Sequence, residues 1–245
     1  MGLRYLATLA FTCLVLNTHS RPQRMRITGP GPQGAFNSLK VPETCKETPR
    51  NSSGVFLIHP DSGFGEPFLA QCDHEYKSGG WNVIQNRYDG SVNFYRDWCN
   101  YKQGFGHLDH EFWLGLDRIN RLTTAKKHEL HIVMTNRTDT YIVKYAKFAV
   151  ASESEFYKLT VGSYSGPKGA DSLTYHNGHK FTAFDRDYDD SPGNCAVSAK
   201  GAWWYALCYK SNLNGMYSFT SGGMVWKFND KFFRMKTTRM LIRSV

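Results

Sequence analysis

The fold of this chain is decided by residues 79–94, which read GGWNVIQNRYDGSVNF. Two glycines precede Trp81, and a mixed run of aromatic, β-branched and amide residues follows as far as Gln85. Runs of this kind, bounded by glycine, asparagine and aspartate, favour short β-strands. The pair Asp89-Gly90 then marks a turn. We therefore expect a strand at 81–85, followed closely by a turn.

Short strands separated by polar turns continue on both sides of this stretch. Further strands are expected at 54–58, 129–134 and 140–145, the last two joined by a loop of hairpin length. Helical patterns are few, at 97–103 and at about 111–122. Beyond about residue 160 the regular signals fade, and glycine, asparagine, aspartate and aromatic residues dominate. A long irregular region of this kind needs cross-links or a bound ion to hold its shape.

The first twenty residues, 1–20, have the layout of a signal peptide. Arg4 is followed by an apolar run from Tyr5 to Leu16 and then by polar residues up to Ser20. The run is too short to cross a bilayer as a helix, and no later stretch approaches about 18 apolar residues. We expect a secreted, extracellular protein with no membrane span.

Residues 21–42 form a basic leader before the domain at 43–245. The leader contains Arg21, Arg24, Arg26 and Lys40 but no acid, and its run Gly29–Pro32 suits neither helix nor strand. We interpret it as a flexible linker, with an arm that seeks polyanionic glycans or acidic surfaces as the alternative. The chain carries a net charge of +9. The part of this positive charge that residues 43–245 carry is too small to suggest nucleic acid as a partner of a secreted protein.

Six cysteines are present, and Cys13 falls within the expected signal peptide. Two pairs suggest themselves: Cys45 with Cys72, which bracket a hairpin, and Cys195 with Cys208, which bracket a short loop. Cys99 remains, beside the apolar stripe of the expected helix at 97–103. Its two interpretations are a half-buried free thiol and an interchain disulfide that makes a homodimer.

Two glycosylation sequons occur, Asn51-Ser52-Ser53 and Asn136-Arg137-Thr138. Both lie in polar stretches that are typical of turns, where an acceptor asparagine is accessible. In a secreted chain we expect Asn51 and Asn136 to carry glycans.

The strongest chemical motif is the acidic stretch 185–195, DRDYDDSPGNC. Four carboxylates within six residues repel one another unless a cation lies among them. Oxygen ligands at alternating positions suit calcium, although glycine and glutamate are missing where an EF-hand requires them. The alternative is a solvated acidic turn, in which Arg186 offsets part of the repulsion.

No motif predicts an enzyme. The stretch His128–His131 lacks zinc-protease spacing and lies on an expected strand, where the first and fourth residues face opposite sides. His176 and His179 surround a turn and read as ordinary polar histidines. No nucleophile elbow or phosphate-binding loop is found. We therefore expect a binding protein.

Several stretches together resemble the fibrinogen C-terminal domain shared by fibrinogen chains, ficolins, tachylectins and angiopoietins. They cover most of 43–245 in order: Gly79–Gln85, Arg87–Phe94, Gly104–Gly106, Glu111–Gly115, Tyr164–Gly166, Asp171–Leu173, Asn194–Ala196, Gly201–Tyr205, Ser211–Gly215 and Leu241–Arg243. The resemblance implies an α+β domain with a central, mostly antiparallel sheet and an irregular, calcium-stabilised C-terminal lobe. It also supports the two cysteine pairs.

The resemblance further implies which residues form the sites. Calcium ligands map by distance from Cys195 onto the side chains of Asp187 and Asp189 and the main-chain carbonyls of Ser191 and Gly193. The ligand pocket of acetyl-binding members maps onto Ala199, Leu207, Cys208, Tyr209 and Trp226. Several relatives have a cis peptide before the second cysteine, here Leu207–Cys208.

The pocket chemistry departs from that of the acetyl-binding lectins. Tyr209 replaces a common histidine, Ala199 replaces a common aromatic residue, and the stretch between Tyr217 and Trp226 is short. Two hypotheses follow. The first is a lectin-like recognition protein that binds glycans, acetylated ligands or microbial surfaces in innate immunity. The alternative is a signalling or matrix ligand that binds a receptor protein through the C-terminal lobe.

Overall fold

The computed structural model describes residues 13, 40–61, 65–218 and 223–245. Contacts divide the chain into two units, Met1–Leu39 and Lys40–Val245, and the elements below belong to the second. The expected signal peptide and most of the expected leader lie outside the described residues. Within the described part of the chain, no helix is both long and apolar enough to cross a membrane.

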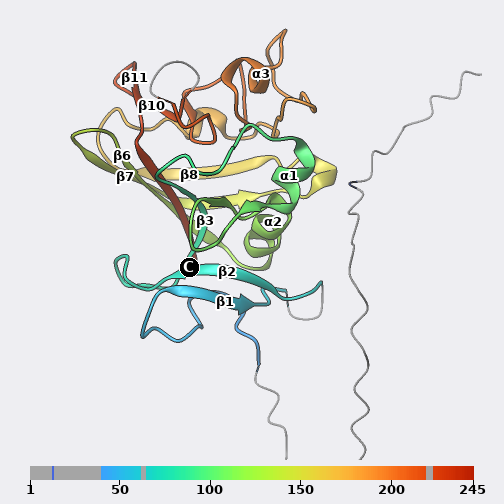
Figure 1. The fold of residues 1–245 in the computed structure, drawn as a ribbon, viewed down its shortest axis with the longest axis vertical. Coiled ribbons are helices and arrows are strands. Elements are labelled where there is room, and N and C mark those ends of the chain that lie inside the picture. The colour runs from blue at the N-terminus through green and yellow to red at the C-terminus, as the bar shows by residue number, and fades with distance from the viewer. Residues whose placement is uncertain (1–12, 14–39, 62–64, 219–222) are drawn as a thin grey trace, which may run out of the picture. The chain divides into compact units, whose positions relative to one another are not determined.

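A large antiparallel sheet forms the centre of the second unit (Figure 1). Its strands follow the order β1-β2-β3-β12-β6-β7-β8, and the short strands β4 and β5 attach beside β3. The bounds are β1 Gly54–Ile58, β2 Phe68–Asp73, β3 Trp81–Arg87, β4 Phe105–Gly106, β5 Phe112–Trp113, β6 His128–Thr135, β7 Thr140–Val150, β8 Leu159–Ser165 and β12 Thr237–Ser244. The last strand therefore lies in the middle of the sheet.

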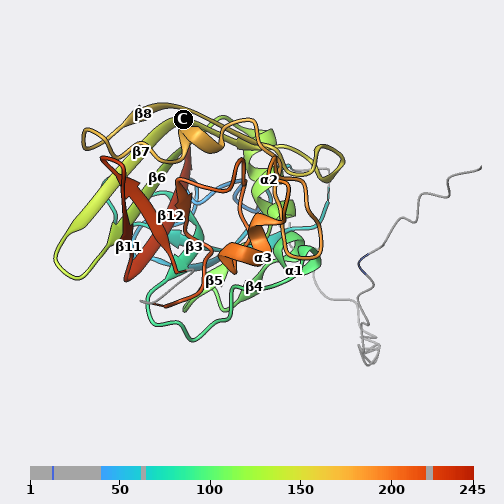
Figure 2. The same cartoon turned by 90° about the horizontal axis from the view of Figure 1, so that it is seen from above.

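Helices cover part of the sheet, and a small lobe follows β8 in the chain (Figures 1 and 2). Helix α2 packs on β7 and contacts α1. The lobe has a second sheet with strand order β11-β10-β9. The remaining bounds are α1 Trp98–Gln103, α2 Leu116–Ala125, η1 Glu153–Glu155, η2 Thr174–His176, α3 Cys195–Ala199, β9 Ser211–Asn212, β10 Val225–Phe228 and β11 Lys231–Arg234. The α+β architecture with its irregular lobe agrees with the sequence-based prediction.

One predicted helix begins in the wrong place. Residues 111–115 were expected to be helical, but Phe112 and Trp113 pair with β3 and β4 as strand β5. Helix α2 starts only after Gly115, whose φ of 106° is a conformation that glycine adopts readily. A Cβ there would lie 2.6 Å from the carbonyl oxygen of Gln103, so the close packing also requires glycine.

Glu111 organises the turn that follows β3. Its carboxylate is fully buried and accepts four backbone N–H groups, those of Tyr88, Asp89 and Gly90 at Oε1 and that of Val92 at Oε2, over 2.7–3.1 Å. Backbone donors arranged around one carboxylate stabilise its charged form. The turn at residues 88–92 is therefore organised by the side chain of Glu111, about twenty positions later in the chain.

Buried polar side chains attach the lobe to the sheet. Gln85 donates to the carbonyl oxygen of Leu213 and to Oδ1 of Asn214, at 3.0 and 2.9 Å. Arg87 donates to the carbonyl oxygens of Leu213 and Gly215, at 3.2 and 2.9 Å. Because an unpaired buried polar group is costly, these bonds fix the position of the 213–215 loop on β3.

Candidate functional site

The acidic stretch 185–195 forms a loop that ends at α3. Asn194 caps that helix, because its Oδ1 accepts the N–H groups of Ala196 and Val197 at 2.8 and 3.1 Å. Asp189 holds the loop together: Oδ1 accepts Ser191 N–H and Oδ2 accepts Cys195 N–H, both at 2.9 Å. The turn residues of this stretch therefore shape the loop through their own side chains.

The four carboxylates of the loop have different partners. Asp185 accepts the backbone N–H of Trp98 at 2.9 Å, and Asp190 lies 3.1 Å from Nδ1 of His179. Asp187 and Asp189 instead lie close to each other: Oδ1 of Asp187 accepts Asp189 N–H at 3.3 Å, and the Asp187 carboxylate raises the pKa of Asp189. Asp190 therefore has a histidine beside it, whereas Asp189 has a second carboxylate beside it.

Electrostatics make this acid pair a suitable place for a cation. Burial raises the pKa of Asp189 most, the N–H groups of Cys195 and Ser191 lower it, and the charge on Asp187 raises it further. A divalent cation would offset both burial and repulsion, and carboxylate and carbonyl oxygens suit calcium. No group of three metal-binding side chains occurs among the described residues. A cation would thus rely on Asp187, Asp189 and the carbonyls of Ser191 and Gly193.

The acidic loop is tied directly to residues 206–209. The disulfide Cys195–Cys208 links them, and Asp190 N–H donates to Ala206 O at 3.2 Å. Leu207 is 70% exposed at the tip, and Cys208 has a φ of 59°. No cis peptide occurs in the described chain, so the one implied at Leu207–Cys208 is wrong for this structure.

The five predicted pocket residues do not come together at the surface. Ala199 and Trp226 are buried, and the Trp226 indole N–H donates to Ala170 O at 2.8 Å. Leu207, Cys208 and Tyr209 are accessible at least in part. None of the five lines the three cavities around Asp73, Arg118 and Arg243. The acetyl pocket implied by the resemblance therefore stays a prediction.

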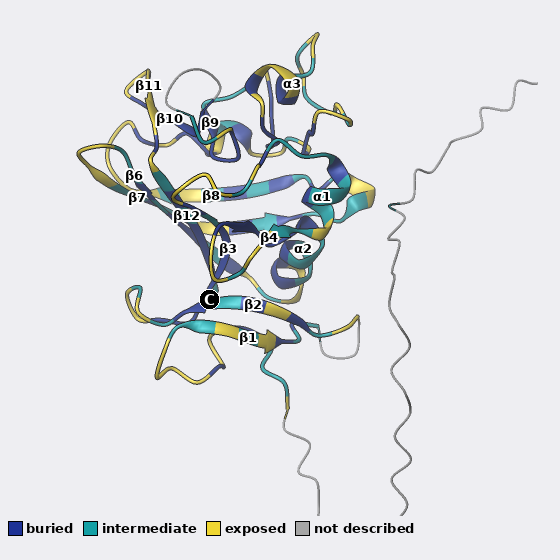
Figure 3. Ribbon diagram, in the orientation of Figure 1, coloured by how far each residue is buried: buried dark blue, intermediate teal, exposed yellow. Residues whose placement is uncertain are grey.

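A different surface lies beside Tyr209, and the sequence analysis missed it. Strand β11, Lys231–Arg234, is exposed at all four positions (Figure 3). The ring of Phe232 is 51% exposed and lies 5.7 Å from that of Tyr209. Lys227 lies 5.9 Å from the same ring. This aromatic and basic surface, made of Tyr209, Lys227, Lys231, Phe232 and Arg234, is called the β11 surface below.

The β10–β11 hairpin has a two-residue turn, Asn229-Asp230. This turn is the sequence signal from which strand β11 could have been predicted. Phe228 pairs with Lys231, and Asn229 and Asp230 between them have φ values of 42° and 64°. Positive φ at both central residues is the geometry of a type I′ turn, which asparagine and aspartate tolerate. Strand β11 is the last strand of its sheet among the described residues, so its outer edge is unpaired.

His176 fixes the chain that leads away from Tyr209. It is fully buried, with Nδ1 at 2.7 Å from Trp204 O and Nε2 at 3.2 Å from the backbone nitrogens of Lys210 and Ser211. Those contacts require a neutral ring that donates at Nδ1 and accepts at Nε2. Burial accordingly lowers the pKa of His176 to about 3. The residue has a structural role in the interior, which its interpretation as an ordinary polar histidine at a turn did not include.

The other predicted modification sites occupy different parts of the fold. The disulfide Cys45–Cys72 is present between the segment before β1 and strand β2. Cys99 is half-buried in α1, and no described cysteine is a free thiol, so the free-thiol interpretation is not supported. An interchain bond through Cys99 stays a prediction.

The two predicted glycosylation sites lie in loops of the fold. Asn51 is exposed, and Asn136 lies in the β6–β7 turn.

The amino-acid sequence is similar to a known domain family and to several characterised proteins. Residues 41–245 match the family described as the C-terminal globular domain of fibrinogen beta and gamma chains. Tenascin-R of Mus musculus is 41% identical over 206 residues, which are 80% of this chain and 15% of that protein. Angiopoietin-related protein 2 of Homo sapiens is 42% identical over 206 residues, covering 80% of this chain and 41% of that protein. The chain thus spans less than half of these relatives.

Solved structures agree with the sequence matches. The fibrinogen-like globe domain of human ANGPTL2 superposes with a TM-score of 0.75 at 41% identity, covering 79% of this chain and 93% of that one. The lamprey fibrin D-dimer in complex with the peptide Gly-His-Arg-Pro-amide gives a TM-score of 0.71 at 32% identity, covering 78% and 69%.

Proposed function

Because this chain belongs to the family of fibrinogen C-terminal globular domains, we propose that it is an extracellular binding protein that recognises a cell-surface or matrix protein through its C-terminal lobe. Its relatives are tenascin-R and angiopoietin-related proteins, which favour a matrix or signalling ligand over the lectin-like hypothesis. The disulfides Cys45–Cys72 and Cys195–Cys208 fit an oxidising, extracellular location.

The β11 surface is the observation that carries this proposal. Phe232 is 51% exposed on a short edge strand that also carries the exposed residues Lys231 and Arg234. Exposed aromatic residues with a nearby arginine are enriched where proteins bind one another. An unpaired strand edge also offers backbone groups to a partner. The buried positions of Ala199 and Trp226 argue against an acetyl-sugar pocket.

The acidic loop has a supporting role in this proposal. Calcium, when bound, would supply the positive charge that holds Asp187 and Asp189 together. Asp189 orders the loop through Ser191 and Cys195, and the Cys195–Cys208 disulfide carries that order to Tyr209. Tyr209 in turn packs against Phe232. The loop therefore positions one side of the β11 surface.

A cell-binding experiment separates the two hypotheses. The labelled, secreted chain is applied in calcium to cells, to cells treated with a protease, and to cells in excess free N-acetylglucosamine. We expect saturable binding that the protease abolishes and the sugar leaves unchanged. Binding that survives the protease but is displaced by the sugar would support the lectin-like function and overturn the protein-binding one.

A further inference from the structure

A second candidate site lies at the end of the chain that is marked C in Figure 1, where strand β12 ends beside the β2–β3 loop. It is a cavity of about 300 Å³. The residues that line it include Lys46, Arg50, Ser78, Glu129 and Arg243. None of them belongs to the acidic loop or to the β11 surface.

Three basic side chains converge on this cavity. Arg50 Nη1 donates to Ser78 O at 3.5 Å, and Arg243 Nη1 donates to the hydroxyl oxygen of the same serine. Lys46 Nζ donates at 3.2 Å to the carbonyl oxygen of Ser244, the residue that follows Arg243 in β12. Two guanidinium groups therefore meet at one serine, and an ammonium group lies at the next residue of the strand.

The positive charges of the cavity outnumber its negative charges. Glu129 neutralises Arg243, because its Oε1 accepts Nε and Nη2 at 2.9 and 2.7 Å. Lys46 and Arg50 form no ion pair within the part of the chain that the structure describes, and donate to carbonyl oxygens instead. Even with a terminal carboxylate on Val245 counted, three positive charges face two negative ones. An anion would offset the repulsion between these cations.

The backbone that carries Lys46 and Arg50 is fixed in advance. The disulfide Cys45–Cys72 attaches the residue before Lys46 to strand β2. Thr48 Oγ1 donates to Cys45 O at 3.0 Å, and Arg50 Nη2 donates back to Lys46 O at 3.4 Å. A ligand that binds here therefore orders little of the main chain, which lowers the free-energy cost of binding.

Further cations continue the positive surface beyond the cavity. Burial lowers the pKa of the His131 ring most, and Glu129 raises it. The charges of Lys144, Lys77 and Arg243 lower this pKa further, which places all three near the ring. Lys144 pairs with His131 across β6 and β7, and Lys77 is exposed in the β2–β3 loop. The surface made of Lys46, Arg50, Lys77, Lys144 and Arg243 is called the Arg243 surface below.

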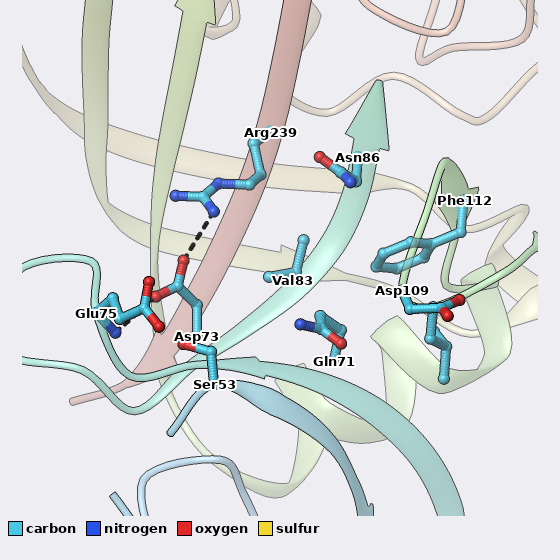
Figure 4. Close-up of a pocket in the computed structure, with 10 residues that line it drawn as sticks. Ser53, Gln71, Asp73, Glu75, Val83, Asn86, Asp109, Phe112 and Arg239 are labelled. Atoms are coloured by element: carbon cyan, nitrogen blue, oxygen red, sulfur yellow. Dashed lines mark hydrogen bonds and ion pairs between the residues drawn. The ribbon is translucent and has the colours of Figure 1, made fainter. Parts of the chain in front are cut away.

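A neighbouring hollow of opposite charge limits the Arg243 surface. In that hollow, Arg239 Nη1 lies 2.8 Å from Asp73 Oδ2, so this arginine is already neutralised (Figure 4). Glu75 and Asp109 line the same hollow. An anion is therefore attracted to the Arg243 surface and repelled by the hollow beside it.

We propose that the Arg243 surface binds a sulfated polysaccharide, with one sulfate group in the cavity between Arg50 and Arg243. The N–H donors of a planar guanidinium match the oxygens of a tetrahedral anion such as phosphate or sulfate. A chain that carries several sulfates would place others at Lys77 and Lys144, which a single small anion in the cavity would leave without a partner.

The polar lining favours a polysaccharide over a protein or a membrane. Apart from Val245, the described residues that line the cavity are charged residues, serine or glycine. Protein interfaces rely on buried aromatic or aliphatic anchors, and membrane-surface sites insert apolar side chains. The Arg243 surface is separate from the β11 surface, so this site does not depend on the protein partner proposed there.

A sulfated oligosaccharide tests this proposal directly. The probe is a fluorescein-labelled heparin hexasaccharide, and its control is an unsulfated heparosan hexasaccharide, which keeps the carboxylates. Binding to the full secreted chain is followed by fluorescence anisotropy at constant ionic strength. We expect saturable binding of the sulfated probe, at least about tenfold tighter than that of the unsulfated one. Equal affinities, or no saturation up to about 1 mM, overturn the proposal.

Matched double variants locate the binding. Lys46→Gln with Arg50→Gln should weaken binding of the sulfated probe at least about tenfold. Both residues are exposed, so the thermal midpoint should stay near that of the wild-type chain. Lys231→Gln with Arg234→Gln removes two exposed cations of the β11 surface and should leave the affinity unaltered. Loss of binding in the β11 variant but not in the cavity variant contradicts the site.

Two further arms separate the remaining sources of anion binding. In a chain with Arg21, Arg24 and Arg26 all changed to glutamine, the cavity variant should still weaken binding by the same factor. If the leader change alone abolishes binding, the leader holds the sulfates and the proposal fails. Phosphatidylserine vesicles that bind the wild-type chain but not the cavity variant, without any binding of the hexasaccharide, would assign the surface to membranes and overturn the polysaccharide proposal.

Discussion

The Glu111 carboxylate and the Arg87 guanidinium lie together in the interior of the fold, with Oε1 3.9 Å from Nε and neither side chain exposed. Glu111 also holds the turn after β3, and Arg87 also holds the 213–215 loop of the lobe. Burial lowers the pKa of Arg87 to about 10, which still leaves it charged at neutral pH. One buried ion pair therefore connects the sheet, its following turn and the lobe.

Replacing Glu111 by glutamine should destabilise the protein strongly. The change leaves Arg87 buried without its counter-charge and puts an N–H₂ group near backbone donors. Losing one partner of a buried pair typically costs about 3–5 kcal/mol. Urea unfolding measures the effect, with the exposed change Glu155→Gln as the control, expected within about 0.5 kcal/mol of wild type. A Glu111→Gln protein as stable as its control would refute this role.

Stability should fall below pH 6.5 because of His176. Its pKa is about 3 in the folded chain against an ordinary value of 6.5, so the unfolded chain binds a proton between these values and the folded chain does not. Stability then decreases by up to about 1.4 kcal/mol per pH unit as the pH falls through this window. Urea unfolding at pH 7.5 and 5.0 should show a smaller loss in His176→Gln. The exposed control His107→Gln should keep the wild-type loss, and an equal loss in all three proteins would exclude His176 as the cause.

Calcium should stabilise the chain through the acid pair. We expect the thermal midpoint to rise in millimolar calcium relative to chelator, because a ligand that binds only the folded state stabilises it. Asp189→Asn should abolish the calcium-dependent shift, whatever its effect on the basal midpoint. Asp230→Asn, in the exposed hairpin turn, should retain it. The same midpoint in calcium and in chelator would rule out the metal site.

Both sequons should be glycosylated in the secreted protein. Asn51 is exposed, and Asn136 uses Oδ1 for the N–H groups of Thr138 and Asp139, which leaves Nδ2 with only a 3.5 Å contact to Tyr141. The glycan attaches to that nitrogen, so the turn need not open. Intact mass before and after enzymatic deglycosylation should show two glycans. Asn51→Gln and Asn136→Gln should each lose one, and an unchanged mass in either variant contradicts use of that site.

Local signals predicted several strands well but not the parts that long-range contacts decide. Strand β1 lies at the predicted residues 54–58, and β3 and β6 extend the predicted strands by two residues each. The segment 111–113 was misread as helical because its backbone is fixed by β3 and by the turn around Glu111. Strand β12 was missed because charged residues interrupt its apolar pattern, although it lies between β3 and β6.

The candidate site was predictable in part. The acidic loop was visible because its carboxylates are close in sequence. The β11 surface depends on Tyr209 and Phe232, twenty-three positions apart, and only their packing at 5.7 Å brings them together. Trp226 was assigned to the pocket region by the family resemblance alone, and no local pattern indicated that it is buried. Exposure is decided by tertiary packing, which no local pattern records.

The most direct measurement of the central claim compares Phe232→Ser with Val197→Ser in equilibrium binding to untreated cells in calcium. Both residues are exposed apolar side chains of the same lobe, at 51% and 49%, but only Phe232 belongs to the β11 surface. We predict that Phe232→Ser weakens binding at least about tenfold and that Val197→Ser binds as wild type does. Equal binding by Phe232→Ser and the wild-type chain would contradict the claim that the C-terminal lobe recognises its partner through strand β11.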